Sequence, residues 1–255
     1  DWWPAQTEAG AGVETLSAMG VSGYITPIRI LIDLPEGSRV TQAVSLRGLR
    51  ALSDSMRADP RVLDVRSLVD LKPGTSILAY SLLYSDLDSA RAENREFVDA
   101  YLSRDERAAL VDVVLRDSTS LTSAMEVVKR IRTMVDSGSI RQLRSATIQV
   151  GGYVAGSVDL QDDMLRRFPL LVALVLGATA VMLAIAFRSI LVPLKAVLMN
   201  SLSVSATFGV IVLVFQHGFG GSVFRLTGPT EAIFVLVPVL VFAVVFGLSM
   251  DYEVF

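Results

Sequence analysis

The chain has 255 residues, an apolar fraction of 52% and a formal net charge of −3 at pH 7. This length allows one or two domains, and the near-neutral charge excludes the strongly basic surface by which nucleic-acid-binding proteins are recognised. There is no cysteine, which excludes disulfides and thiolate metal sites. Of the 23 basic and 26 acidic residues, 20 and 23 lie before Phe168. A charged, water-facing first part is therefore joined to an apolar second part.

The first part predicts alternating strands and helices. Segment 24–34 is rich in β-branched residues and roughly alternates in polarity, as a strand with one buried face does, and 40–56 has apolar residues near helical spacing. The other predicted elements are a helical insertion at 77–102, a helix at 120–135 and strands at 61–68, 108–115 and 146–150. The order β-α-β-β-α-β is that of ferredoxin-like domains. The predicted fold class is thus an α+β ferredoxin-like domain over residues 1–160, which opens on the loop-like DWWPAQTEAG.

Both ends of the chain look like cuts in a longer protein, since the first residues fall in a loop and the last inside a helix. The glycine-rich stretch VGGYVAG at 150–156 predicts a tight turn from the last strand into a helix. We expect this helix, which includes 157–167, to continue into the membrane.

Residues 161–255 predict an α-helical transmembrane domain. Segment 168–187 has no charge and is 20 residues long, or about 30 Å as a helix, which matches the hydrocarbon thickness of a bilayer. Further spans are predicted at about 194–215 and 233–255. The connector RSILVPLK carries Arg188 and Lys195 but no acid, and positive charge in short loops marks the cytoplasmic side. The residues before about 168 should therefore be extracytoplasmic, with the spans in the plasma membrane.

The usual sequence signals of enzymes and cofactor sites are missing. The chain lacks the GxxxxGK[ST] phosphate loop and the GxGxxG dinucleotide pattern. His217 is the one histidine, which gives little support to a catalytic triad or a histidine-based metal site. We therefore predict no catalytic residues, no cofactor and no metal.

A polar stripe runs along the second predicted span. It consists of Asn200, Ser201, Ser203 and Ser205, of which Ser201 and Ser205 are one turn apart and share a face. Small polar residues commonly pack membrane helices together, which is the favoured interpretation. A direct role in a proton or water path is the alternative.

The third predicted span ends in FGLSMDYEVF, which places Asp251 beside Tyr252 after an uncharged run from Ile233 to Met250. If the helix has already left the membrane there, the acid lies in water. No basic cluster marks such a boundary, however, and Gly247, one turn earlier, would let another helix approach closely. Acids held within a span commonly serve proton or ion pathways, and a tyrosine hydroxyl can hydrogen-bond either protonation state of a carboxyl group. Asp251 is thus a candidate for taking up and releasing a proton, with Tyr252 as a hydrogen-bonding neighbour, and Glu253 lies on another face.

The segments FRSILVPLKAVLMNSLSVSATFG (187–209) and FGLSMDYEVF (246–255) resemble the second half of the MmpL branch of the resistance-nodulation-division (RND) permeases. The resemblance implies proton-driven export of lipids, glycolipids or other hydrophobic molecules, drugs included, at the inner membrane, through a periplasmic porter domain. It also implies that Asp251 and Tyr252 face an equivalent Asp-Tyr pair from the N-terminal half of the same protein, and that the two pairs together form the predicted proton relay. That half is absent from this chain.

Two other functions share this architecture. One is a lipid- or sterol-sensing receptor of the Patched-like kind, which binds lipid without net pumping. The other is an accessory of protein translocation like SecD/SecF. Transport driven by an imposed pH gradient would distinguish the exporter from the receptor, and a translocon partner would favour the accessory.

Overall fold

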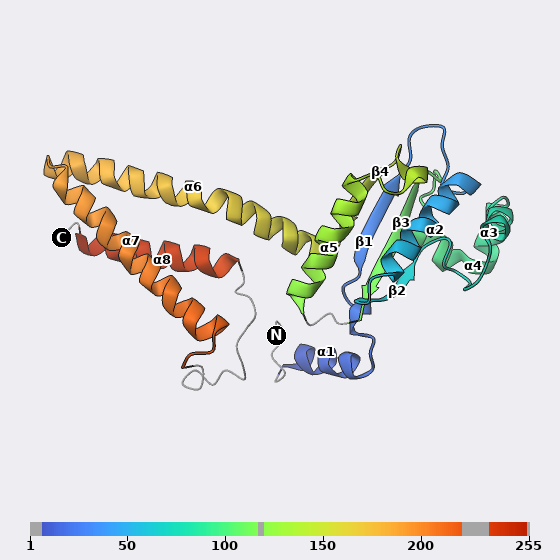
Figure 1. Ribbon diagram of the computed structural model, residues 1–255, viewed down its shortest axis with the longest axis horizontal. Coiled ribbons are helices and arrows are strands. Elements are labelled where there is room, and N and C mark those ends of the chain that lie inside the picture. The colour runs from blue at the N-terminus through green and yellow to red at the C-terminus, as the bar shows by residue number, and fades with distance from the viewer. Residues whose placement is uncertain (1–6, 117–119, 221–234, 254–255) are drawn as a thin grey trace. The chain divides into compact units, whose positions relative to one another are not determined.

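The computed structural model describes residues 7–116, 120–220 and 235–253, and of residues 249–253 it describes the backbone alone. The chain separates into two compact units, Asp1–Val158 and Asp159–Phe255. Figure 1 shows the elements of both. Each unit is described by itself.

The first unit is built on a four-stranded antiparallel sheet with the strand order β2-β3-β1-β4. The strands are β1 (Ile28–Asp33), β2 (Val62–Arg66), β3 (Ala108–Leu115) and β4 (Thr147–Gly151). In the centre, Ile30 of β1 pairs with Val111 on one side and Val150 on the other. All four predicted strands form, but β1 begins four residues later than predicted, because Ser22–Tyr24 form the 3-10 helix η1.

Helices α2 (Ala43–Arg57) and α5 (Leu121–Asp136) pack on the sheet and bury its apolar face (Figure 1). Alternate residues of β1 point into this core, since a strand turns successive side chains to opposite faces. The core joins three groups of buried side chains: Ile28, Ile30 and Ile32 of β1; Leu46, Leu49 and Leu52 of α2; and Val127, Val128 and Ile131 of α5. The order β1-α2-β2-β3-α5-β4 is the predicted succession of elements.

The insertion between β2 and β3 contains two helices, α3 (Ile77–Leu83) and α4 (Leu87–Tyr101), where the sequence predicts one helical stretch at 77–102. The side chain of Asp86 accepts a hydrogen bond from the backbone N–H of Ser89 and so caps the start of α4. Helix α4 is itself kinked at Asn94, which has φ −140° and ψ 46°.

The start of the chain corrects the predicted loop. Helix α1 (Glu8–Ala18) begins inside DWWPAQTEAG. The side chain of Thr7 accepts a hydrogen bond from the N–H of Gly10, which is an N-terminal cap. Gly10 and Gly12 lower the intrinsic helix propensity of this segment, so propensity alone does not reveal the helix.

Gly152 makes the predicted turn between the last strand and the long helix α6 (Tyr153–Phe187). Its φ of +99° lies in the left-handed region that favours glycine. A Cβ atom at this position would lie 2.8 Å from the carbonyl oxygen of Pro27. The prediction of a tight strand-to-helix turn at 150–156 is therefore confirmed, as is the continuation of the helix through 157–187.

The second unit contains the apolar part of α6, then α7 (Leu191–Ile211), which passes into the π-helical turn η3 (Val212–Gln216), and then α8 (Leu236–Glu253). Helix α6 and the segment Leu191–Gln216 are long and apolar enough to cross a membrane. The apolar part of α8 that the structure describes, Leu236–Leu248, is shorter. The third span therefore stays a prediction.

Candidate functional site

Helix α8 carries the predicted relay pair in its last turn. The helix runs from Leu236 to Glu253, and so includes Asp251 and Tyr252, whose side chains lie outside the described part of the structure. Gly247 precedes Asp251 by four residues, which places the two positions one turn apart on the same side of α8. A Cβ atom at Gly247 would have no described neighbour within 4 Å. The close approach of another helix predicted for this side is thus not made by the described residues.

The other side of α8 is packed. Phe242 and Phe246 are buried and form a cluster with Val204 of α7. The ring of Phe242 stacks on Phe246 with centroids 5.3 Å apart and meets Phe168 of α6 edge-on at 5.6 Å. These offset and edge-on arrangements are the favoured geometries of aromatic pairs. The cluster therefore holds all three helices of the second unit together.

Helix α8 consequently has one packed side and one free side within the described chain. Val244 and Leu248, which neighbour Gly247 on the helix surface, are 58% and 57% exposed. Asp251 lies one turn after Gly247 on this same side of α8.

The structure divides the predicted polar stripe of α7. Asn200 is only 3% exposed and belongs to the buried side of α7 together with Val204. Ser201 is half-buried, whereas Ser205 is exposed. Asn200 is thus the stripe residue that the structure brings to the packed side of the helix, and Ser205 is not.

Two hydroxyl groups of α7 are satisfied within the helix itself. Ser203 Oγ donates to the carbonyl oxygen of Met199 at 3.0 Å, and Thr207 Oγ1 donates to that of Ser203 at 2.9 Å. This bonding to the preceding turn engages the only proton of each hydroxyl. Ser203 is therefore poorly placed to donate this proton to a proton path.

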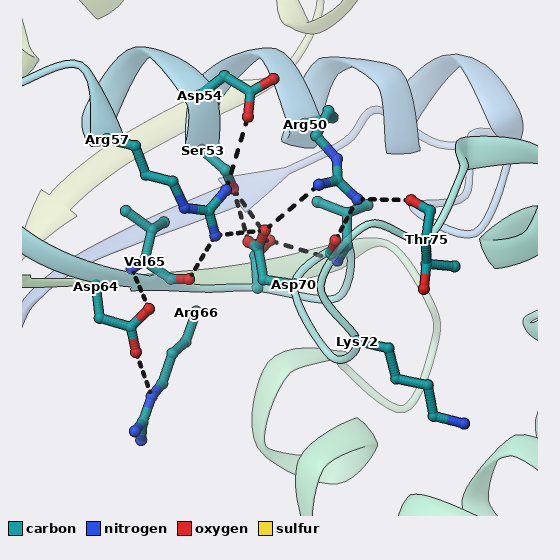
Figure 2. Close-up of polar contacts among 12 residues, drawn as sticks. Arg50, Ser53, Asp54, Arg57, Asp64, Val65, Arg66, Asp70, Lys72 and Thr75 are labelled. Carbon is teal, nitrogen blue, oxygen red and sulfur yellow. Dashed lines mark hydrogen bonds and ion pairs between the residues drawn. The ribbon is translucent and has the colours of Figure 1, made fainter.

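The first unit contains a buried carboxylate that the sequence analysis missed (Figure 2). The side chain of Asp70 is 3% exposed. Its Oδ1 accepts a hydrogen bond from Arg57 Nη2 at 2.7 Å, and its Oδ2 accepts one from Ser53 Oγ at 2.8 Å. Ser53 and Arg57 both come from α2. Asp70 lies far from both in the sequence and shares no periodic pattern with them, so no sequence signal marks this contact.

Arg50 extends this network to the loop that leads into α3. Its Nη2 donates to the carbonyl oxygens of Val69 and Thr75, and its Nη1 lies 4.0 Å from Asp70 Oδ1 (Figure 2). The guanidinium also lies over the ring of Tyr80, with its central carbon 5.8 Å from the ring centroid. The partners of Asp70 and Arg50 are thus protein groups, which indicates that the network fixes the loop on α2.

Asp59 is a second buried carboxylate, paired with two arginines. Arg61 donates to it from Nε at 3.0 Å and from Nη2 at 2.9 Å, and Arg130 of α5 donates to Oδ2. The hydrogen bonds from Arg61 hold the pKa of Asp59 well below its usual range, against the opposing effect of burial. Over the described residues, no group of three or more His, Asp or Glu side chains is placed to hold a metal ion.

Comparison with known proteins gives this arrangement a family. The model of the MMPL family matches residues 2–255. The mycolic acid-containing lipids exporter MmpL11 of Mycolicibacterium smegmatis is 30% identical over 97% of this chain and 22% of its own length. The trehalose monomycolate exporter MmpL3 of Mycobacterium tuberculosis is 37% identical over 44% of this chain and 12% of its own length.

A relative with a different printed role also matches. The heme uptake protein MmpL11 of Mycobacterium tuberculosis is 36% identical over 59% of this chain and 15% of its own length. The chain spans at most about a fifth of the length of these curated relatives. Their names are those of exporters and an uptake protein, in agreement with the prediction that the chain is not an enzyme. Because the family model covers nearly the whole sequence, this chain belongs to the MMPL family of membrane proteins.

Proposed function

We propose that this chain is part of a proton-driven exporter that moves lipids or other hydrophobic molecules out of the inner membrane. The observation that carries the proposal is the Asp251–Tyr252 pair in α8, after a run from Ile233 to Met250 that has no charge. Family membership supports it, as do relatives named as exporters of mycolic acid-containing lipids and of trehalose monomycolate.

A carboxyl group in this position suits proton coupling. In surroundings of low polarity, the neutral and the ionised forms of Asp251 differ strongly in energy. Each protonation step therefore changes which arrangement of the helices is favoured, as any ligand with different affinity for two states does. The hydroxyl of Tyr252 can accept from the protonated acid or donate to the carboxylate.

The free side of α8 supports a helix partner for the relay. Val244, Gly247 and Leu248 lie uncovered one turn before Asp251. We assign to this side a helix from the N-terminal half of the same protein, which would carry the equivalent Asp-Tyr pair. Asn200, buried on the packed side of α7, is proposed as a supporting polar residue, with Ser201 and Ser205 in lesser roles.

The two units take the roles that this mechanism needs. The first, with its β-α-β-β-α-β order and antiparallel sheet, is proposed as an extracytoplasmic ferredoxin-like porter domain. The second is proposed as a bundle of three spans, α6, α7 and α8, whose connector with Arg188 and Lys195 faces the cytoplasm.

Reconstitution of the intact protein that contains this chain tests the proposal. Liposomes with an imposed pH gradient are loaded with fluorescent lipid, and in a parallel set with heme, because one relative is named for heme uptake. Asp251→Asn should abolish gradient-driven lipid movement, and Tyr252→Phe should slow it. Glu253→Gln removes a carboxylate from the same helical turn. This variant is the matched control and should retain transport.

Lipid transport by Asp251→Asn at the rate of the unchanged protein would contradict the proton relay. Lipid binding without gradient-driven movement in the unchanged protein would instead favour the receptor. Gradient-driven movement of heme but not of lipid would support the proton relay and would show that heme, not lipid, is the cargo.

A further inference from the structure

A groove along α4 is lined by arginines that the proposed function does not use. It has a volume of about 680 Å³ and is lined by Arg91, Ala92, Arg95, Asp99, Leu102 and Arg104. The lining residues carry three positive charges and one negative charge. The groove therefore has the electrostatic character of an anion site.

The kink in α4 organises two of these arginines around one carboxylate. Arg91 Nε donates to Asp99 Oδ1 at 3.1 Å, and Arg95 Nε lies 3.5 Å from Asp99 Oδ2. In a straight helix, residues eight apart are separated by about 12 Å, close to the limit that an arginine and an aspartate can bridge. Asn94, with its non-helical backbone, lies between the two arginines. The kink thus favours the approach of Arg91 to Asp99, which Arg95 reaches as an ordinary i,i+4 neighbour.

Donor groups remain free in this arrangement. The contacts of Arg91 and Arg95 with Asp99 involve the Nε atoms, and the terminal Nη groups of both arginines donate no hydrogen bond to a described residue. Arg104 is exposed and has no hydrogen bond or ion pair to a described residue. Planar guanidinium groups with free Nη donors bind phosphate and carboxylate oxygens in a bidentate manner.

Arg57 of α2 shows the contrast. Arg57 is paired with the buried Asp70 and donates further to a backbone carbonyl, so its donors are taken up by the protein. Asp99, by comparison, is 47% exposed, and Arg95 is 84% exposed. An incoming anion can therefore reach the guanidinium groups of the groove without displacing a buried partner.

We propose that the groove of α4 binds an anionic group of the phosphate type, held by Arg91, Arg95 and Arg104, with Asp99 orienting the guanidinium groups of Arg91 and Arg95. The same chemistry fits an anionic lipid headgroup and free phosphate. This binding needs no pH gradient and no transport, so it stands or falls independently of the proton relay.

Binding to the purified chain in neutral detergent at low ionic strength tests the proposal. Isothermal titration would compare inorganic phosphate, short-chain phosphatidic acid and short-chain phosphatidylcholine. Both anionic probes should bind saturably, and the zwitterionic probe should bind more weakly. Arg95→Gln and Arg104→Gln should each weaken anion binding about tenfold, as expected for the loss of a charge-assisted contact. Arg47→Gln, which removes an exposed arginine of α2, is the control and should leave the affinity for both anionic probes unchanged.

The probes also identify the source of the anion. Phosphatidic acid that binds much more tightly than phosphate indicates a lipid headgroup, and equal affinities indicate recognition of the free anion. Circular dichroism would verify that both variants keep their helices. Unsaturable binding of both anionic probes, or unchanged affinity in folded Arg95→Gln and Arg104→Gln, would overturn the proposal.

Discussion

Asp59 accepts two parallel hydrogen bonds from the guanidinium of Arg61, two residues later in the chain, with nitrogen–oxygen distances of 3.0 and 2.9 Å. Arg130 of α5 donates to the same carboxylate. The contact between Asp59 and Arg130 therefore joins the segment after α2 to α5, close to the start of β2. Because the carboxylate is buried, removing its charge leaves arginine donors without their partner.

Asp59→Asn should lower the free energy of unfolding by about 2 kcal/mol at pH 7, as the loss of charge-assisted hydrogen bonds does. The pKa of Asp59 is depressed in the folded state, so its contribution is present above the ordinary pKa of 3.8 and is lost as the pH falls further. The difference between the two proteins should therefore narrow below about pH 4. Urea unfolding between pH 3 and 7 measures this, with the exposed Asp54→Asn as a control expected to stay near the unchanged protein. An equal difference in the free energy of unfolding at every pH would contradict the depressed pKa of Asp59.

Gly152→Ala should destabilise the first unit by about 2 kcal/mol or more. The added Cβ would meet the carbonyl oxygen of Pro27 at 2.8 Å, and the φ of +99° disfavours any side chain. Gly156→Ala, one turn into α6, has no neighbour within 4 Å and should be neutral or slightly stabilising. Thermal unfolding of both variants compares the two glycines, and similar melting temperatures would show that the turn tolerates a side chain.

Tyr101 should make stability depend on pH in the alkaline range. Its hydroxyl donates to Asp112 Oδ2 at 3.1 Å, and burial, together with the charge of Asp112, raises the pKa of Tyr101 to about 12. Its contribution is therefore complete below the ordinary pKa of 10.0 and is lost as the pH rises towards 12.

Tyr101→Phe should consequently cost about 1 kcal/mol near pH 8, and its stability should fall less steeply between about pH 10 and 11.5 than that of the unchanged protein. Unfolding monitored by circular dichroism over this range provides the test. The exposed Tyr153→Phe serves as the control and should reproduce the original profile. A profile of Tyr101→Phe as steep as that of the control would argue against this role.

Phe242→Ala should loosen the packing of the second unit. Its ring contacts both Phe168 and Phe246, so the substitution removes two aromatic pairs, each worth about 1 kcal/mol. Unfolding of this chain in mixed micelles should therefore shift to lower denaturant, whereas Leu240→Ala, on an exposed position of α8, should shift it less. Equal shifts would indicate that the cluster does not hold the helices together.

The elements of the first unit could be predicted from the sequence because their burial follows simple periods. Ile28, Ile30 and Ile32 alternate as a strand requires, and the buried leucines of α2 follow helical spacing. Helix α1 and the break at Asp86 depend on single capping side chains, which periodicity does not detect. The boundaries of these elements are accordingly harder to predict from the sequence than their type.

The candidate site shows a similar limit. The acid–tyrosine pair of α8 is visible in the sequence because a charge interrupts an apolar run. The separation of Asn200 from Ser205 depends on which side of α7 meets the aromatic residues of α8, and this is a tertiary property. The contacts of Asp70 with Ser53 and Arg57 depend on how the loop folds back over α2, so no local pattern announces them.

The hydroxyl of Tyr80 holds both backbone groups of Lys72: it accepts from the N–H at 2.8 Å and donates to the carbonyl oxygen at 2.9 Å. The hydroxyl of Tyr80 thus makes the two backbone hydrogen bonds that a neighbouring strand would make in a sheet. Although the side chain of Lys72 is exposed, its amide hydrogen should exchange with deuterated solvent only when Tyr80 leaves its place. The rate of that exchange therefore reports how often the loop around Lys72 opens.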